Sequence, residues 1–482
     1  MTDDVKQTPK ILIVGGGYAG FYTAFKLQKQ LRRNEATITV VDPLPYMTYQ
    51  PFLPEIAAGN LEARHALVPL RRHLSSSTVL AGRVTGIDHA SKTATITPAV
   101  GEPWQESYDI VVVTAGSVSR TFPIPGVADE AIGMKQIEEA ESVRDRMVQN
   151  FDAASVLPKG DPQRARLLTV TVVGGGFAGI ETIAELRSFA STLLKRYVSI
   201  DFDETKFHMI EALGRIMPEV SLPTSLKVIE NLTQRGVEVH LNTQLASAVG
   251  GTVELSTGES FESNLIIWTA GVMPTPVLRN TDLPLGPRGH LNVEAELRVV
   301  DADGVVVPDA WGAGDVAQVP DLTGGGVNGY CVPNAQHAVR QGKRLAKNLV
   351  ATLRGELPKK YIHKNLGAVA GLGVGVGAFQ SGKIGFVGVL AWFMHRGYHG
   401  LAMPMWERKF RIFGDYAGGL FLGRDEVGIP TRGEPREVFE RWASRPKPPA
   451  AEPSTALAPE PAKPARAPRK PRAKVEAATP GE

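Results

Sequence analysis

The sequence predicts an α/β fold with two Rossmann-like dinucleotide-binding domains, because a buried strand followed by Gly-x-Gly-x-x-Gly occurs twice. Each copy is followed by a second strand-like run that ends in an acidic residue, Asp42 after the first copy and Glu211 after the second. Each is also followed by an apolar run that ends at a glycine, Gly116 or Gly271. The glycines of the two loops are Gly15, Gly17 and Gly20, and then Gly174, Gly176 and Gly179.

The first loop has the features of a pyrophosphate site. Gly15 permits a tight turn, Gly17 lets a phosphate approach the backbone, and Gly20 lets the next helix pack against the strand. That helix begins near Tyr18 and directs the positive end of its dipole at the phosphates. Asp42 stands where an acid contacts a ribose hydroxyl. A plain glycine-rich turn is the alternative, and the strand, the spacing and the acid together argue against it.

Two dinucleotide sites in one chain favour a bound FAD paired with a diffusible nicotinamide nucleotide. In the second site Glu181 lies on the first turn of the helix, where its carboxylate either faces the nucleotide or complements the helix dipole. Glu211 repels a 2′-phosphate, so NADH is favoured over NADPH, although the nearby Arg215 weakens that preference.

Three other stretches are candidates for the flavin site. Asp315 sits among glycines in Gly312-x-Gly314-Asp315, which suits either a ribityl or pyrophosphate contact or a turn. The proline-rich and aromatic loop 43–55 either covers a flat ring system or caps the core. Gln336 and Arg340 are four residues apart on one face of an expected helix, where they could meet a polar carbonyl ligand.

The composition limits the chemistry. Cys331 is the only cysteine, which excludes an intrachain disulfide, a multi-thiolate metal or iron–sulfur site, and a flavoenzyme that works through a cysteine pair. No metal site is expected. The net charge of +3 gives no reason to expect nucleic-acid binding. The polar start does not resemble a signal peptide, and no run of 18 or more apolar residues predicts a membrane span.

The carboxy-terminal part changes character. Residues 365–440 combine apolar aromatic stretches with flanking Arg and Lys, as in 384–396 and 406–413. This pattern is typical of a helix that lies in a membrane interface, and a dimer or domain interface is the alternative. Residues 444–482 are rich in Pro, Ala and charged residues, so a disordered basic tail is expected.

These motifs together resemble the type II NADH dehydrogenases, which are single-chain NADH:quinone oxidoreductases that pump no protons. The resemblance rests on both glycine loops, the Glu181-x-x-x-Glu185 helix, Trp268 to Gly271, the Asp315 segment and the Ala335-Gln336 helix. It implies an FAD-binding domain at 10–135 and 290–364, with an NADH-binding domain inserted at 136–289. It also implies a membrane-associating region at 365–440.

The resemblance implies the following cofactor contacts. For FAD they are Gly15, Gly17, Tyr18, Ala19, Gly20, Asp42, Val84, Ala115, Gly116, Asp315 and Gln336, and for NADH they are Gly174, Gly176, Gly179, Glu181, Glu211 and Gly271. Residues with an expected catalytic role are Glu181, Gln336, Arg340 and Lys364. Gln336 matches the first glutamine of the family's quinone motif, whereas Arg340 replaces the second.

The expected reaction is oxidation of NADH through non-covalently bound FAD, with reduction of a membrane quinone, menaquinone being the expected acceptor. The expected place is the cytoplasmic face of the cell membrane, where the protein would be peripheral and, by resemblance, a homodimer. Two alternatives stay open: a soluble FAD-dependent NAD(P)H reductase of a small redox protein, and a flavin-based redox sensor. Turnover with quinone distinguishes all three.

Overall fold

The computed structural model describes residues 8–363 and 367–429, together with 436 and 440. The chain divides into two compact units, Met1–Pro430 and Thr431–Glu482, and the helices and strands with named bounds belong to the first. Lys364 and the expected tail 444–482 lie outside the described residues.

The first sheet holds the first glycine loop. Its strand order is β21-β22-β9-β1-β2-β5, and all neighbours are parallel except β21 and β22. Four of the five residues of the central strand β1 are buried, in keeping with its unbroken apolar run. The strands are β1 Lys10–Val14, β2 Thr37–Asp42, β5 Thr78–Ala81, β9 Ile110–Val113, β21 Arg298–Val300 and β22 Val306–Gly312.

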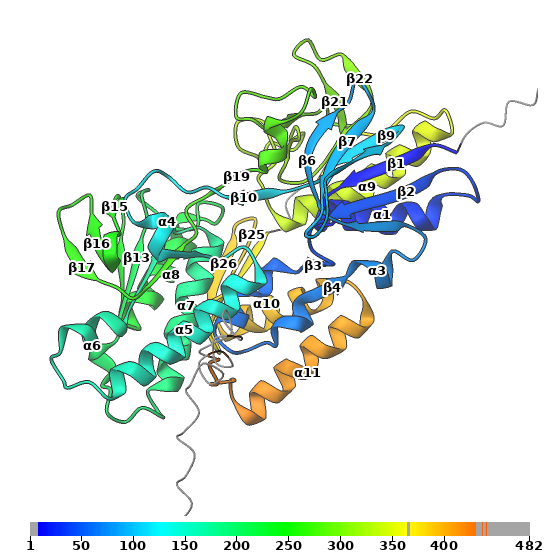
Figure 1. The fold of residues 1–482 in the computed structure, drawn as a ribbon. Coiled ribbons are helices and arrows are strands. Elements are labelled where there is room, and N and C mark those ends of the chain that lie inside the picture. The colour runs from blue at the N-terminus through cyan, green and yellow to red at the C-terminus, as the bar shows by residue number, and fades with distance from the viewer. Residues whose placement is uncertain (1–7, 364–366, 430–435, 437–439, 441–482) are drawn as a thin grey trace, which may run out of the picture. The chain divides into compact units, whose positions relative to one another are not determined.

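Helix α1 (Tyr18–Gln30) begins where the sequence predicts, and it packs along α9 (Ala335–Leu353), as Figure 1 shows. Residues 79–84 are divided between two sheets. Their first part, in β5, joins the first sheet, and their last part, in β6, pairs with β7. The small sheet consists of β6 Arg83–Asp88, β7 Thr93–Thr97 and β8 Trp104–Ser107.

The second sheet repeats this plan around the second glycine loop. Its order is β11-β18-β12-β13-β14, with all neighbours parallel. The strands are β11 Ala131–Gly133, β12 Thr169–Val173, β13 Lys206–Ile210, β14 Val237–His240 and β18 Leu265–Trp268. The helices are α5 Ile137–Ser155, α6 Pro162–Leu167, α7 Phe177–Leu193 and α8 Leu222–Gln234. A small antiparallel sheet completes this part, made of β15 Leu245–Ser247, β16 Thr252–Leu255 and β17 Ser260–Glu262.

The two parts are joined by an antiparallel pair, β10 (Ser117–Ser119) and β19 (Val272–Pro274). The chain therefore enters and leaves the second part side by side, between β9 and β22 of the first sheet (Figure 1). The second part is thus an insertion in the first. Its strand β11 lies before residue 136, so the second sheet begins earlier in the chain than the boundary expected from the sequence. Helix α5 has a buried side that includes Val143 and Met147.

The carboxy-terminal region begins with the antiparallel strands β24 Ala368–Gly371, β25 Gly377–Ser381 and β26 Ile384–Gly388. Helices α10 (Val389–Ala402) and α11 (Trp406–Leu422) follow. Both expose large apolar side chains, among them Phe393, Trp406, Phe410 and Phe421. Among the helices of the described residues, none has the length and apolar character that crossing a bilayer requires.

Short elements fill the connections of the first unit. They are β3 Tyr46–Thr48, α2 Leu53–Ala57, β4 Leu67–Pro69, α3 Leu70–His73, α4 Val127–Glu130, β20 Leu291–Asn292 and β23 Ala317–Gln318. The proline-rich loop 43–55 therefore contains β3 and runs into α2, whose five residues are buried.

Candidate active site: two nucleotide loops and a buried acid–base pair

The first glycine loop has the geometry that a pyrophosphate requires. Gly15 has a φ of 98°, a left-handed conformation that favours glycine. A Cβ on Gly20 would lie 1.8 Å from the carbonyl oxygen of Gly15, so only glycine lets α1 pack this closely. A Cβ on Gly17 would meet nothing within 4 Å, which leaves the helix N-terminus open to a phosphate. The cradle therefore fits a dinucleotide.

Asp42 lies at the carboxyl end of β2, beside this loop. Its Oδ2 accepts a hydrogen bond from the Gly16 amide at 2.7 Å, and its Oδ1 accepts one from the Leu44 amide at 2.8 Å. Burial raises the pKa of Asp42, while these two amides pull it in the opposite direction. The carboxylate is thus fixed next to the position that a ribose takes in this fold.

The second loop reproduces the first. Gly174 has a φ of 109°, and a Cβ on Gly179 would lie 1.9 Å from the Gly174 oxygen. Glu211 takes the part of Asp42, since its Oε2 accepts a hydrogen bond from the Gly175 amide at 2.5 Å. The guanidinium of Arg215 donates to the carbonyl of Val220. It is therefore committed to the main chain rather than presented to a 2′-phosphate.

A threonine closes each loop from the neighbouring strand. The hydroxyl of Thr114 donates to the carbonyls of Val14 and Gly15, and that of Thr269 donates to those of Val173 and Gly174. The sequence analysis did not single out either threonine, although both precede the predicted contacts at the strand ends.

The glycines predicted at the strand ends follow the carboxyl ends of β9 and β18. Gly116 and Gly271 have φ values of 71° and 97°, and a Cβ on either would meet nothing within 4 Å. Ala115 packs against Gly15, because a Cβ added to Gly15 would lie 2.6 Å from Cα of Ala115. Both open glycines thus leave free backbone next to a nucleotide loop.

Asp315 is brought to the first loop by the turn after β22. A Cβ on Gly314 would lie 3.2 Å from Cβ of Ala19, so this turn packs on the start of α1. Oδ2 of Asp315 accepts a hydrogen bond from the Ser117 hydroxyl at 2.9 Å, and Lys135 donates to the same hydroxyl at 2.9 Å. Burial lowers the pKa of Lys135. No motif in the sequence marks Ser117 or Lys135, because each is a single polar residue in a stretch without a recognisable pattern.

Tyr18 and Val84 are part of the surrounding wall. The Tyr18 hydroxyl accepts a hydrogen bond from the Gln50 amide at 2.9 Å, which ties α1 to the proline-rich loop. Burial raises the pKa of Tyr18 well above its usual value. Val84 is buried in β6, opposite Ile96.

Gln336 and Arg340 share the first turns of α9. Arg340 donates to the main-chain carbonyl of Gln336 at 3.1 Å, and the Gln336 amide donates to the carbonyl of Gly367 at 3.5 Å. Two histidines, His337 and His363, lie close by. Burial is the main cause, and the charge of Arg340 the second, that lowers the pKa of His363 to about 4. His337 is hydrogen-bonded to the Tyr361 hydroxyl at 2.9 Å.

Glu181 meets the carboxy-terminal region through a buried acid–base pair. Its Oε1 lies 3.1 Å from Nε2 of His395 and accepts a hydrogen bond from the Gly371 amide at 2.9 Å. Nδ1 of His395 lies 3.6 Å from Oε1 of Glu55. Burial by itself would lower the pKa of His395, but the bond to Glu181 and the nearby acids outweigh it and raise the pKa. The imidazole is thus held ready to carry a proton between two carboxylates.

His395 and Glu55 are functional candidates that sequence reasoning missed. They come from α10 and α2, more than 300 residues apart, and only the folded chain brings them to α7. Burial raises the pKa of Glu55, while the charges of Arg396 and His395 act in the opposite direction.

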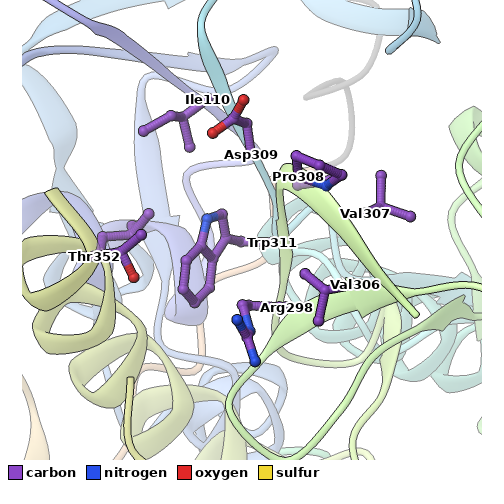
Figure 2. A pocket seen from close by; sticks show the side chains of 10 residues that line it. Ile110, Arg298, Val306, Val307, Pro308, Asp309, Trp311 and Thr352 are labelled. Atoms are coloured by element: carbon purple, nitrogen blue, oxygen red, sulfur yellow. The ribbon is translucent and has the colours of Figure 1, made fainter. Parts of the chain in front are cut away.

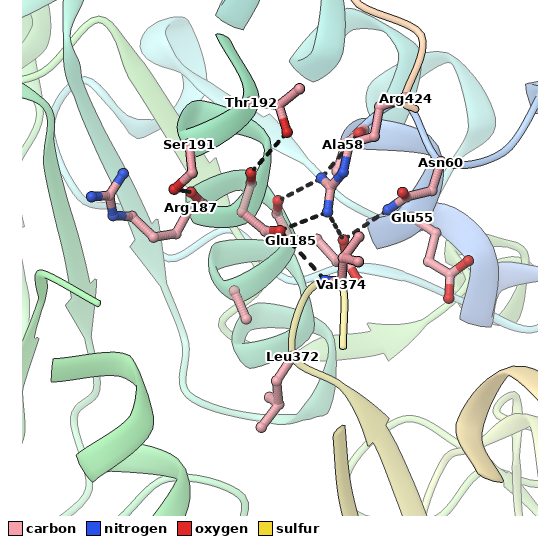
Figure 3. A network of polar contacts seen from close by, with 12 residues as sticks. Glu55, Ala58, Asn60, Glu185, Arg187, Ser191, Thr192, Leu372, Val374 and Arg424 are labelled. Atoms are coloured by element: carbon pink, nitrogen blue, oxygen red, sulfur yellow. Dashed lines mark hydrogen bonds and ion pairs between the residues drawn. The ribbon is translucent and has the colours of Figure 1, made fainter. Parts of the chain in front are cut away.

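A second ion pair anchors the same helix one turn later. Glu185 lies 3.2 Å from the guanidinium of Arg424 and accepts a hydrogen bond from Asn60 at 2.8 Å (Figure 3). Arg424 also donates to the carbonyl of Ala58. The segment after α11 is therefore tied to both α7 and α2, which holds the α10–α11 pair in place beside Glu181.

A surface pocket of about 230 Å³ lies elsewhere, lined by Ile110, Arg298, Asp309 and Trp311 among others (Figure 2). Ile110 begins β9, whose far end leads to Ala115. The pocket is therefore at the opposite end of the first sheet from the glycine loop. None of the site residues predicted from the sequence lines it.

Two equivalent glycine loops, one on each of two parallel sheets, define an oxidoreductase of the kind that binds two dinucleotides. Comparison with known proteins agrees, since the sequence profile of the pyridine nucleotide-disulphide oxidoreductases matches residues 9–342. The chain belongs to that family. The α/β fold predicted from the sequence is confirmed.

Curated relatives and solved structures extend the match. The chain is 27% identical over 431 residues to a probable NADH dehydrogenase of Dictyostelium discoideum, covering 87% of this chain and 91% of that protein. It is 28% identical over 396 residues to the type II NADH:quinone oxidoreductase Ndh of Mycobacterium tuberculosis, covering 80% and 82%. The structure of NDH2 from Plasmodium falciparum in complex with NADH superposes with a TM-score of 0.78, at 19% identity, over 87% of this chain and all of that one. These relatives confirm the resemblance stated from the sequence.

Proposed function

We propose that the protein is a type II NADH:quinone oxidoreductase. FAD would be held at the first glycine loop and NADH at the second, and a membrane quinone, menaquinone being the expected acceptor, would be reduced without proton pumping. The observation that carries the proposal is the contact of Glu181 with His395, because it joins the second nucleotide loop to helix α10 of the apolar carboxy-terminal pair. The names of the curated relatives support the same reaction.

In the proposed reaction, the residues expected to bind FAD and those expected to bind NADH do so. The open backbone at Gly17 and Gly116 and the carboxylates of Asp42 and Asp315 suit FAD, which when bound supplies two-electron transfer between nucleotide and quinone. The open backbone at Gly176 and Gly271 with Glu211 suits NADH.

The chain's own part is to bind, to orient and to hold a proton. Glu181, the fifth residue of α7, follows the second loop closely, so it orients the nicotinamide end of the nucleotide. His395 holds a proton between Oε1 of Glu181 and Oε1 of Glu55, next to the region where a quinone must accept one. Gln336 and Arg340 provide polar contacts for the quinone carbonyls, and Lys364 is kept as a proposed site residue from the resemblance alone.

The apolar faces of α10 and α11 supply the membrane contact in this proposal. Trp406 and Phe410 are each 72% exposed, and Phe421 is 86% exposed. Aromatic residues with flanking cations suit a helix pair that lies in the interface without crossing it. The expected place is the cytoplasmic face of the cell membrane, and a homodimer is proposed from the family resemblance.

The experiment that tests the function is NADH oxidation by the detergent-solubilised, FAD-loaded chain, with and without a menaquinone analogue. Rapid bleaching of the flavin by NADH and reoxidation that depends on the quinone are the expected results. Bleaching without quinone turnover would point instead to a protein acceptor or a redox sensor. Proton translocation by inverted vesicles that depends on this enzyme and NADH would contradict the absence of pumping.

Flotation with anionic vesicles tests the membrane contact. The double variant Trp406→Ser, Phe410→Ser should float about tenfold less well, since each aromatic contributes buried apolar area to the interface. The exposed pair Phe202→Ser, Val198→Ser near α7 is the control and should float normally.

A further inference from the structure

Three side chains that commonly bind metals gather on one face of the second sheet. His208 lies in β13, while Glu238 and His240 lie in β14. The parallel register pairs His208 with Glu238 and Ile210 with His240. Because side chains alternate along a strand, the three project from the same face. The ring of Phe261 in β17 stacks on His208 there, with 3.9 Å between ring centroids.

The distances within this cluster are those between ligands of one small cation. Nδ1 of His208 lies 3.2 Å from Nε2 of His240 and 3.5 Å from Oε2 of Glu238. Ligand atoms about 2.0–2.2 Å from a tetrahedral zinc ion are separated by roughly 3.3 Å. One ligand atom from each residue lies within 4.8 Å of the others, so a single ion can reach all three.

The surroundings suit ligation as well. Oε2 of Glu259 lies 3.8 Å from Nδ1 of His240, the ring nitrogen that does not face His208. A carboxylate at that nitrogen is the usual outer partner of a metal-binding histidine, because it fixes the ring and the tautomer.

The cluster is specific to the second domain, although the two sheets are built alike. The strand register places Thr39 and Thr78 in the first sheet where His208 and Glu238 stand in the second, and Leu80 where His240 stands. The fold as such therefore does not require these polar residues. The sequence analysis expected no metal site. About thirty residues separate His208 from the other two, so no close ligand spacing marks this cluster in the sequence.

We propose that His208, Glu238 and His240 form a binding site for one divalent transition-metal ion of the zinc type. The ion joins β13 to β14 near their carboxyl ends, three residues before Glu211. The amide of Glu211 donates to the carbonyl of His240 at 2.9 Å, so the ion stabilises the backbone that presents this acid to the second glycine loop. The site does not depend on the identity of the electron acceptor.

The test is zinc binding by the full chain loaded with FAD. The protein is stripped with a chelator, dialysed against buffered zinc and analysed for bound metal and for flavin. One zinc ion per chain is expected, with cobalt substitution giving the visible absorption of a tetrahedral site. His208→Gln and His240→Gln should each weaken binding at least about tenfold.

Glu238→Gln keeps the proposal falsifiable if a histidine variant does not fold, because the Glu238 side chain is 54% exposed and the change is conservative. It should also weaken zinc binding. Glu230→Gln, an exposed acid of α8 in the same domain, is the matched control and should bind zinc normally. Absence of saturable zinc binding, or equal binding by the Glu238 and Glu230 variants, would overturn the proposal.

Discussion

The two glycine loops have nearly the same backbone, but the helices that follow them have different neighbours. Helix α1 packs along α9 of its own domain, so closely that a Cβ on Gly342 would lie 2.4 Å from the Ala19 carbonyl oxygen. Helix α7 begins at Phe177, so Glu181 is its fifth residue rather than part of the expected first turn, and Glu181 contacts the carboxy-terminal region through His395.

This difference separates a resident nucleotide from an exchanging one. A loop enclosed by its own domain suits a cofactor that stays bound, because release would require that domain to open. A loop whose helix contacts another region close to the loop suits a nucleotide that binds, reacts and leaves. The same local motif therefore serves two tasks, and the task is set by what packs against the helix.

The largest effect should come from replacing the most tightly packed glycine of each loop, Gly20 or Gly179, with alanine. Gly20→Ala forces a Cβ to 1.8 Å from the Gly15 oxygen, so we expect loss of bound flavin and of nearly all activity. Gly179→Ala creates the same clash at 1.9 Å, yet it should keep the flavin and raise KM for NADH about tenfold or more.

Flavin absorbance and steady-state kinetics distinguish these outcomes. Gly418→Ala in α11, where a Cβ meets nothing within 4 Å, is the control and should behave like the wild type. Equal flavin loss in Gly20→Ala and Gly179→Ala would break the comparison between a resident and an exchanging site.

Glu181→Gln should sharpen the comparison, since α1 has Tyr22 where α7 has Glu181, two residues after the last glycine of the loop. The variant removes the negative charge that raises the pKa of His395, so that pKa falls and the proton is lost at lower pH. We expect kcat to fall about tenfold with the flavin retained, and the alkaline limb of its pH profile to move to lower pH. An unchanged profile would remove His395 from the proposed proton path.

Asp42→Asn and Glu211→Gln compare the two loop acids directly. Each substitution replaces a carboxylate, which accepts a hydrogen bond from a glycine amide, with a neutral side-chain amide. A hydrogen bond to a charged group usually contributes about 1.5–3 kcal/mol. Glu211→Gln should raise KM for NADH about tenfold and narrow the preference over NADPH. Asp42→Asn should leave that preference unchanged and speed flavin release. These quantities are measured by kinetics with both nucleotides and by flavin dissociation after dilution.

The smallest effect concerns acid stability of the second domain. His208 has its pKa lowered to about 4 in the fold, while an unfolded histidine titrates near 6.5. Between those values the unfolded chain binds a proton that the folded chain does not, so the free energy of unfolding decreases as pH falls through that window. The loss is at most about 3 kcal/mol. With a chelator present, His208→Thr should reduce the drop in urea midpoint between pH 7 and pH 5.

Much of the fold was predictable because strand, glycine turn and helix are adjacent in sequence. β1 with α1, β12 with α7, the acids after β2 and β13, and the strand ends at Gly116 and Gly271 all follow from local patterns. Some small residues, such as Gly342 against Ala19, are required only because two helices pack closely. The neighbouring sequence does not reveal them.

The parts of the site that sequence did not reveal are made by long-range contacts. His395 reaches Glu181 and Glu55 only because α10 folds back onto α7 and α2, and Ser117 and Lys135 meet Asp315 across the antiparallel junction. A buried charge pair depends on how distant segments pack together, and the local periodicity of the sequence gives no information about that packing.

The insertion of the second domain has a consequence for synthesis on the ribosome. β9 ends at Val113, but its partner β22 begins only at Val306. At typical rates of elongation, roughly 10 to 40 seconds separate the two strands. The inserted sheet has all its strands by Trp268 and can fold first, while β9 waits with an unpaired edge. Nascent chains halted between these points should therefore need a chaperone to shield the first sheet.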